Sequence, residues 1–352
     1  MSVPKLAALA AGVLGLVACQ ATDSRPPAAL VFYPDPPDPP RMQFLRSIGG
    51  AADLDGKRGG FDELLFGAPL EAEPFRTPYG VLLHDGRALV CDMEQGALLE
   101  LELATNRLAP LALDGRARMT KPVNLARADD GVLYVADLGR RQVVVLDGER
   151  RWQAEFGPWG EASRPVDVDV AGDELYVTDA GAACVRVLAR ADGVERRVLG
   201  QGVLRGPTNL ALDADGNAYV VDTIDGRVAV FDRAGTLVRH LGSPGSSVGN
   251  LARPKGIACF GELVFVNDAA FENCQIFDRA GNPLMFFGGP GAGPGCFNLP
   301  AGVFACAAEP GLFEAELAPD FEAEAFVVVT NFYGARLAFY ALGKSKRFVY
   351  PD

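Results

Sequence analysis

The residues best able to bind a ligand occur at one position of a repeated motif. Each copy of the motif opens with a proline, and three successive copies carry an amide or carboxylate two residues later: Asn124, Asp167 and Asn209. Oxygen donors of this kind suit Ca²⁺. If this position begins the innermost strand of a repeat, the three side chains meet at the mouth of a central channel. They are the predicted calcium or ligand site, with capping of the strand ends as the alternative.

The other three copies carry glycine at this position: Gly80, Gly256 and Gly302. Lys255 directly precedes the second of these glycines and is expected at the edge of the same face. Its ammonium group is placed to meet an anionic ligand or the Asp167 carboxylate, so Lys255 is a predicted ligand-binding residue. The alternative is a solvated charge on the rim.

Groups for acid–base catalysis are scarce in this chain. Histidine is the commonest general base, and only His84 and His240 are present. Both are expected away from the channel mouth, in a turn and in an outer strand. No zinc-type cysteine spacing occurs. The sequence therefore predicts no catalytic residue.

The motif that positions these residues recurs six times. Its prolines are spaced by 42 to 47 residues: Pro78, Pro122, Pro165, Pro207, Pro254 and Pro300. After each proline an apolar segment turns on Asp or Gly and returns as a second apolar segment. A strand-forming repeat of this length predicts an all-β, six-bladed β-propeller of four-stranded antiparallel blades.

Two other features of the repeat predict structural roles. The second segment of each copy ends in an acid or amide that is expected to accept backbone N–H groups in the next turn: Asp92, Asp137, Asp179, Asp222, Asp268 and Asn331. Residues 41–49 read as the last strand of a blade and are expected to pair with residues 336–342. Such pairing closes the ring and hides two sheet edges.

The sixth copy contains an acidic insertion at residues 307–325. It carries six acids, and no Lys or Arg occurs from residue 280 to residue 335. One interpretation is a loop that binds a basic partner or cations, and the other is a solvated surface insertion. The spacing of Leu312, Phe313, Leu317 and Phe321 predicts that the segment lies down on its blade.

The motif resembles NHL repeats, as in GPTNLALDADGNAYVVD followed by RVAVFDRAG. Over residues 41–345 the chain resembles bacterial six-bladed propeller lipoproteins with NHL-type repeats. Related six-bladed enzymes of the lactonase type hold a catalytic calcium at the channel mouth. That resemblance implies Asn124, Asp167 and Asn209 as calcium ligands in a hydrolase or lyase.

The N-terminus predicts a membrane anchor. Residues 1–18 read as a signal peptide, and Leu16–Cys19 (LVAC) resembles a bacterial lipobox in which Cys19 is lipidated. Residues 19–40 then form a Pro-rich stalk, the propeller follows at 41–345, and 346–352 form a C-terminal tail. Gln20 after the cysteine favours the outer membrane by resemblance to enterobacterial lipoproteins, facing the periplasm or the surface.

Charge and cysteine content narrow the partners. A net charge of −12 excludes the basic surface that nucleic-acid binding needs. Beside Cys19, six cysteines remain, and both disulfides in the last two blades and buried thiols are compatible with an envelope protein. We expect a monomeric, lipid-anchored propeller that presents a face to an envelope protein, peptide or glycan, with an exported complex as one candidate setting. A calcium-dependent hydrolase or lyase is the alternative.

Overall fold

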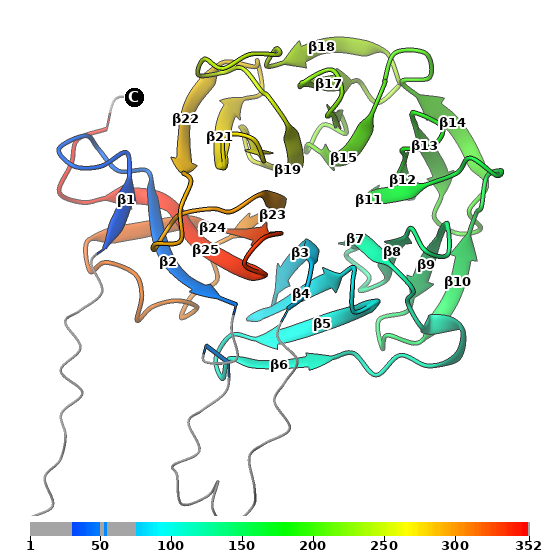
Figure 1. Cartoon of the computed structure of the whole chain (residues 1–352), viewed down its shortest axis with the longest axis horizontal. Coiled ribbons are helices and arrows are strands. Elements are labelled where there is room, and N and C mark those ends of the chain that lie inside the picture. The colour runs from blue at the N-terminus through cyan, green and yellow to red at the C-terminus, as the bar shows by residue number, and fades with distance from the viewer. Residues whose placement is uncertain (1–29, 50–52, 55–74, 351–352) are drawn as a thin grey trace, which may run out of the picture.

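Each copy of the motif folds into one antiparallel sheet, and the six sheets form a closed ring (Figure 1). This arrangement comes from a computed structural model that describes residues 30–49, 53–54 and 75–350. The predicted signal peptide, Cys19 and the first part of the stalk lie outside the described residues. The predicted class, an all-β six-bladed propeller, is confirmed.

The blades follow the chain, and within each blade the first strand is the innermost. Blade 1 contains β3 (Pro78–His84), β4 (Arg87–Asp92), β5 (Ala97–Glu102) and β6 (Arg107–Pro110). Blade 2 contains β7 (Pro122–Arg127), β8 (Leu133–Asp137), β9 (Gln142–Leu146) and β10 (Trp152–Phe156). Blade 3 contains β11 (Pro165–Ala171), β12 (Glu174–Asp179), β13 (Cys184–Ala189) and β14 (Glu195–Leu199).

Blade 4 contains β15 (Pro207–Leu212), β16 (Ala218–Asp222), β17 (Arg227–Phe231) and β18 (Leu237–Leu241). Blade 5 contains β19 (Pro254–Phe260), β20 (Leu263–Asp268), β21 (Asn273–Asp278) and β22 (Pro283–Gly288). Blade 6 contains β23 (Pro300–Ala307), β24 (Phe321–Asn331) and β25 (Arg336–Ser345), completed by β2 (Met42–Ile48) and β1 (Val31–Tyr33). A 3₁₀ turn, η1 (Gly115–Ala117), precedes blade 2.

The inner strands all begin at one face of the ring, which we call the strand-start face, and end at the opposite strand-end face. Apolar side chains fill the space between neighbouring blades in six clusters, one for each pair of neighbours around the ring. Burial of this apolar surface is the main force that holds the blades together.

The five strand-end acids accept N–H groups in the turn that follows them, as predicted. All six residues, Asn331 included, also accept an N–H group from the segment before their proline, which the prediction did not include. Both carboxylate oxygens of Asp222 accept backbone N–H groups from Arg205 and Gly206, which precede the proline of the same blade. Asp222 also accepts the N–H of Asp225 in the turn that follows it. The equivalent residues Asp92, Asp137, Asp179, Asp268 and Asn331 make the same kind of bond before their prolines.

The N-terminal strand closes the ring, as the sequence predicts. β2 pairs antiparallel with β25, from Met42 opposite Leu342 to Ile48 opposite Leu337. In Figure 1 the blue β2 therefore lies beside the red β25. β1 adds a fifth strand to this sheet, and the Tyr33 hydroxyl donates a 2.8 Å hydrogen bond to the Gly295 carbonyl.

The acidic insertion is docked onto the protein rather than standing free. Phe313 is buried against Phe326 and Phe339, which confirms that the segment lies on its blade. The Glu316 carboxylate pairs with Arg46 of β2 at 3.2 Å, and the Glu309 carboxylate accepts the N–H of Gly86 in blade 1. The insertion therefore ties the closing strand and blade 1 to blade 6.

The remaining acids near the insertion mostly have basic partners too. Asp320 pairs with Arg347, Glu322 with Lys346, and Glu324 with Arg41. Because four of the six acids of the insertion already pair with bases of this chain, the structure gives little support to the interpretation that the insertion binds a basic partner. Its interactions explain why acids gather here: they match the bases of β2 and of the segment that follows β25.

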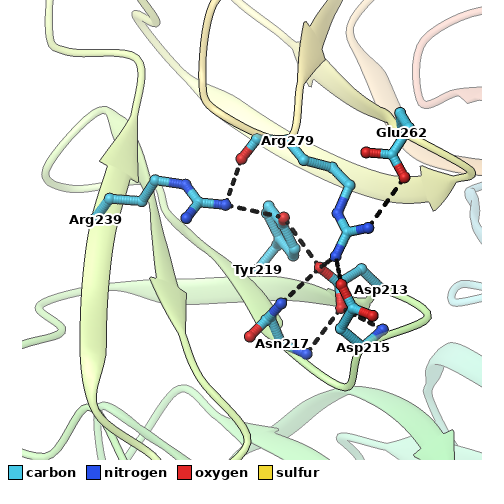
Figure 2. Close-up of polar contacts among 7 residues, drawn as sticks. All are labelled: Asp213, Asp215, Asn217, Tyr219, Arg239, Glu262 and Arg279. Atoms are coloured by element: carbon cyan, nitrogen blue, oxygen red, sulfur yellow. Dashed lines mark hydrogen bonds and ion pairs between the residues drawn. The ribbon is translucent and has the colours of Figure 1, made fainter.

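Arginines on the strand-end face link neighbouring blades. In Figure 2, Arg279 of blade 5 reaches the β15–β16 turn of blade 4 and pairs with Asp213 at 2.8 Å and with Asp215. Arg190 of blade 3 makes the equivalent link to Asp130 of blade 2 at 2.8 Å. These acids are already paired with arginine, so the cluster in Figure 2 is a clamp between blades rather than a metal site.

Candidate functional site

The central channel holds a cavity of about 410 Å³ that is lined by one segment from each inner strand. Asn124 and Asp167 lie in its wall, at the level nearer the strand-start face. Further along, the wall carries Asp169, and His84 and Arg127 lie where their strands end. The expectation that His84 lies in a turn is wrong, because it ends the inner strand β3 and lines the channel cavity. It lies at the strand-end side of that cavity, away from the strand-start mouth.

The Asp167 carboxylate links two inner strands. One oxygen accepts the N–H of Val168, and the other accepts the N–H of Leu210 in blade 4, both at 2.8 Å. Asp169, which sequence reasoning missed, makes the same pair of bonds to Val170 and Leu212. The alternating PVDVDV pattern of β11 was the available signal for this second acid. Burial raises the pKa of Asp167 well above its ordinary value and that of Asp169 to about 6.

The two predicted amides are also engaged. Oδ1 of Asn124 accepts the N–H of Leu125 at 3.0 Å. Oδ1 of Asn209 accepts a 3.1 Å hydrogen bond from the hydroxyl of Tyr79, which reaches across the ring from blade 1. Figure 1 shows β3 and β15 on opposite sides of the channel. The Tyr79 side chain thus spans the channel at its strand-start end.

These donors fit calcium poorly. Each oxygen of Asp167 already accepts a backbone N–H group, and both amide oxygens have donors of their own. Calcium needs six to eight oxygen ligands, and only one carboxylate belongs to this set. Within the described residues, no group of three His, Cys, Asp or Glu side chains is arranged to hold a metal. Asn124, Asp167 and Asn209 as arranged here therefore do not suit a calcium ion.

The glycines that alternate with these polar residues have a steric role. A Cβ atom at Gly302 would lie 2.2 Å from the Tyr79 carbonyl oxygen, and one at Gly256 would lie 2.2 Å from the carbonyl oxygen of Ala301. Real Cβ atoms do not come this close to backbone atoms. The inner strands of blades 5, 6 and 1 therefore approach more closely than side chains at this position allow.

Lys255 does not join the channel group. It lies in a separate pocket of about 160 Å³ on the strand-start face, between blades 5, 6 and 1. The pocket, which we call the Lys255 pocket, is lined by Tyr79, Arg253, Lys255, Ala269, Leu299, Pro300, Ala301 and Phe332. Burial lowers the pKa of Lys255, and the neighbouring Arg253 guanidinium lowers it further. A half-buried ammonium beside a guanidinium is a site prepared for an anion.

Exposed apolar side chains lie on the same face as this pocket, and one of them, Phe332, lines it. Phe332 and Tyr333, in the turn after β24, are 38% and 59% exposed, and Ile224, in the turn after β16, is 63% exposed. These turns join the second and third strands of their blades, so they lie on the strand-start face with the Lys255 pocket. A pocket with cations on a face with exposed apolar residues is typical of a surface that binds a partner.

The cysteines in the described part are all free thiols. Cys91, Cys184 and Cys274 are buried, and Cys259, Cys296 and Cys306 are half-buried. The buried-thiol interpretation therefore describes the structure, and the disulfide interpretation does not. Across the part of the chain that the structure describes, no helix has the length and apolar character needed to cross a bilayer.

Comparisons with known proteins support the fold and leave the activity open. No protein-family model matches the chain, and no curated relative matches it either. A Bacteroides thetaiotaomicron VPI-5482 structural genomics protein of unknown function matches with a TM-score of 0.60 and 15% identity, covering 85% of this chain and 76% of that one. Virginiamycin B lyase from Staphylococcus aureus matches with a TM-score of 0.53 and 11% identity, covering 77% and 96%.

Kuenenia stuttgartiensis hydrazine synthase also matches, with a TM-score of 0.51 and 12% identity, covering 78% of this chain and 97% of that one. At such low identity these likenesses concern the fold alone. They agree with a β-propeller fold, and the count of six blades comes from the sheets of this chain itself. Any function must be argued from the residues of its own faces.

Proposed function

We propose that this protein is a non-enzymatic, monomeric binding propeller of the cell envelope, held there by lipid on Cys19. Its strand-start face binds a partner protein or peptide around the Lys255 pocket, which lies between blades 5, 6 and 1. The proposal depends most on one observation, the Lys255 pocket on a face that also exposes Phe332, Tyr333 and Ile224. The outer-membrane location is part of the same proposal and comes from Leu16–Cys19 and Gln20.

Charge favours an anionic region on the partner. The chain is acidic overall, with a net charge of −12, so the two neighbouring cations of the Lys255 pocket stand out against their surroundings. A neutral glycan would leave these cations without a counter-charge, whereas a peptide can bring both an acid and an apolar side chain. The exposed apolar residues supply contact area, and the charges supply orientation and specificity.

Site-directed photo-crosslinking tests this proposal. A photoreactive residue at Tyr333 probes the strand-start face, and one at Val194 is the matched control because both positions are 59% exposed. Val194 lies in the β13–β14 turn, on the strand-end face. We expect one discrete adduct in intact envelopes from position 333 that is weakened by Lys255→Glu. Equal labelling from both positions would contradict a partner on the strand-start face.

A further inference from the structure

The Lys255 pocket holds two cations without an acidic partner. In the part of the chain that the structure describes, neither Lys255 nor Arg253 has a carboxylate within ion-pair distance. Two acids lie nearby, and both are used on the backbone: Asp268 accepts the N–H of Arg253, and Glu272 accepts the N–H of Leu299. By contrast, Arg279 on the opposite face is paired with three carboxylates.

The walls of the pocket are apolar. The Phe332 side chain comes from the turn after β24, and Leu299, Pro300 and Ala301 come from the start of blade 6. Its volume is about 160 Å³, less than half that of the channel cavity at about 410 Å³. The pocket therefore has room for a charged group with a short substituent, whose apolar part would contact these walls.

Backbone strain at Leu299 provides an independent observation. Leu299 has a φ of +48°, in the left-handed region that residues other than glycine rarely adopt. Its N–H is held by the Glu272 carboxylate at 3.1 Å, and its carbonyl accepts the N–H of Phe332 at 3.1 Å. Strained residues held in this way cluster at ligand sites. The two hydrogen bonds hold Leu299 and Phe332 together in the pocket wall beside the cations.

We propose that the Lys255 pocket binds a carboxylate carrying a short apolar or aromatic substituent. Lys255 and Arg253 bind the carboxylate, and Phe332 and Leu299 contact the substituent. This inference rests on the proposed function only in treating the strand-start face as the partner face. Two sources share this chemistry: the C-terminal residue of a polypeptide and a free small carboxylic acid. Inorganic phosphate is the competing anion, and the apolar walls disfavour it.

NMR of ¹³C-methylated lysines tests the proposal. The experiment uses the chain from residue 20 onward, which retains every described residue and five lysines, so that the Lys255→Met variant assigns the Lys255 signal. The probes are benzoate, N-acetylphenylalanine, its uncharged amide and inorganic phosphate. We expect saturable shifts of the Lys255 signal with the first two, and at least tenfold weaker effects with the amide and phosphate.

Variants locate the binding. Lys255→Met and Arg253→Met should each weaken binding of N-acetylphenylalanine by tenfold or more, as followed by calorimetry. Lys121→Met is the matched control, because Lys121 is exposed and directly precedes the proline of blade 2, as Arg253 does in blade 5. The carboxylate site would be overturned if the chemical shift of Lys255 did not change on titration. Equal shifts with N-acetylphenylalanine and its amide would also overturn it.

Two further measurements are needed. One distinguishes a polypeptide C-terminus from a small acid, and the other tests the Lys255 pocket and the partner face separately. A tetrapeptide ending in free phenylalanine that binds tenfold more tightly than benzoate identifies a polypeptide terminus, and the reverse order identifies a small acid. Either order supports the carboxylate site. If carboxylates bind but photo-crosslinking at Tyr333 gives no adduct, the partner face fails and the pocket stands. If adducts form but no carboxylate binds, the pocket proposal fails alone.

Discussion

The hydroxyl of Tyr79 in blade 1 donates a hydrogen bond to Oδ1 of Asn209 in blade 4, across the full width of the central channel. This contact divides the centre of the ring into two spaces. The channel cavity lies on its strand-end side, and the Lys255 pocket, which the Tyr79 side chain also lines, lies on the strand-start face. The two cavities have no lining residue in common.

The first prediction concerns this bond. Tyr79→Phe removes the hydroxyl and leaves the buried Asn209 amide without its donor. The expected cost is about 1–3 kcal/mol of the free energy of unfolding, which appears as a melting temperature lower by a few degrees. Tyr333→Phe is the matched control, because Tyr333 is 59% exposed and its loss should be neutral. Equal melting of both variants would show that the bond across the channel contributes nothing.

Much of the ring was predictable because its signals are local and repeated. The proline spacing and alternating apolar segments predict the blades, and the pattern of residues 41–49 predicts the closing strand. The Tyr79–Asn209 contact could not be predicted, since it joins side chains 130 positions apart. The Lys255 pocket was half predictable: its lysine sits at a repeat position, but Phe332 and Leu299 come from the next blade.

The second prediction concerns the docking of the insertion on the closing strand. The buried Gln43 side chain donates to the Glu316 carbonyl at 2.7 Å and accepts the N–H of Ala318 at 3.0 Å. Gln43→Leu leaves both backbone groups unpaired, at about 1–3 kcal/mol each. Chemical denaturation should show this loss, whereas the exposed Gln201→Leu should leave stability unchanged. If the Gln43 variant were as stable as the unaltered protein, docking of the insertion on the closing strand would not contribute to stability.

The third prediction concerns pH. Burial raises the pKa of Asp169 from 3.8 to about 6. Because the folded state then binds the proton more tightly than the unfolded state, this group stabilises the fold fully below pH 4. The contribution is lost as pH rises through 6, by on the order of 3 kcal/mol. Asp167 acts in the same direction, since burial raises its pKa too.

Denaturant titrations at pH 4, 5 and 6 measure this effect. Asp169→Asn should reduce the fall in the free energy of unfolding between pH 4 and pH 6, whatever its effect on stability at a single pH. Asp129→Asn, at an exposed carboxylate, is the matched control. An Asp169 variant with the same pH slope as the parent protein would mean that this carboxyl group is not buried in the folded state.

The fourth prediction concerns calcium. We expect the melting temperature to be the same after EDTA treatment and after addition of Ca²⁺, because the oxygens of Asp167 are occupied by backbone N–H groups. A bound ion at a hundred times its Kd would add about 2.7 kcal/mol. An increase in melting temperature that disappears in Asp167→Asn would restore the calcium site and justify lactone and ester screens. Asp129→Asn controls for loss of surface charge.

The last prediction concerns the membrane anchor. Apolar acyl chains on Cys19 would hold the acidic protein at a bilayer whose anionic headgroups repel it, and anchoring of this kind grows with the number of buried methylenes. Cys19→Ala should move the protein from the membrane fraction to the soluble fraction and abolish labelling with radioactive palmitate. Cys91→Ala is the matched control, since Cys91 is a buried thiol in blade 1.

Membrane retention of the Cys19 variant would mean that another part of the chain, or a membrane-bound partner, holds the propeller in place. Separation of inner and outer membranes on a density gradient would then locate the unaltered protein, and recovery in the inner-membrane fraction would contradict the sorting inferred from Gln20.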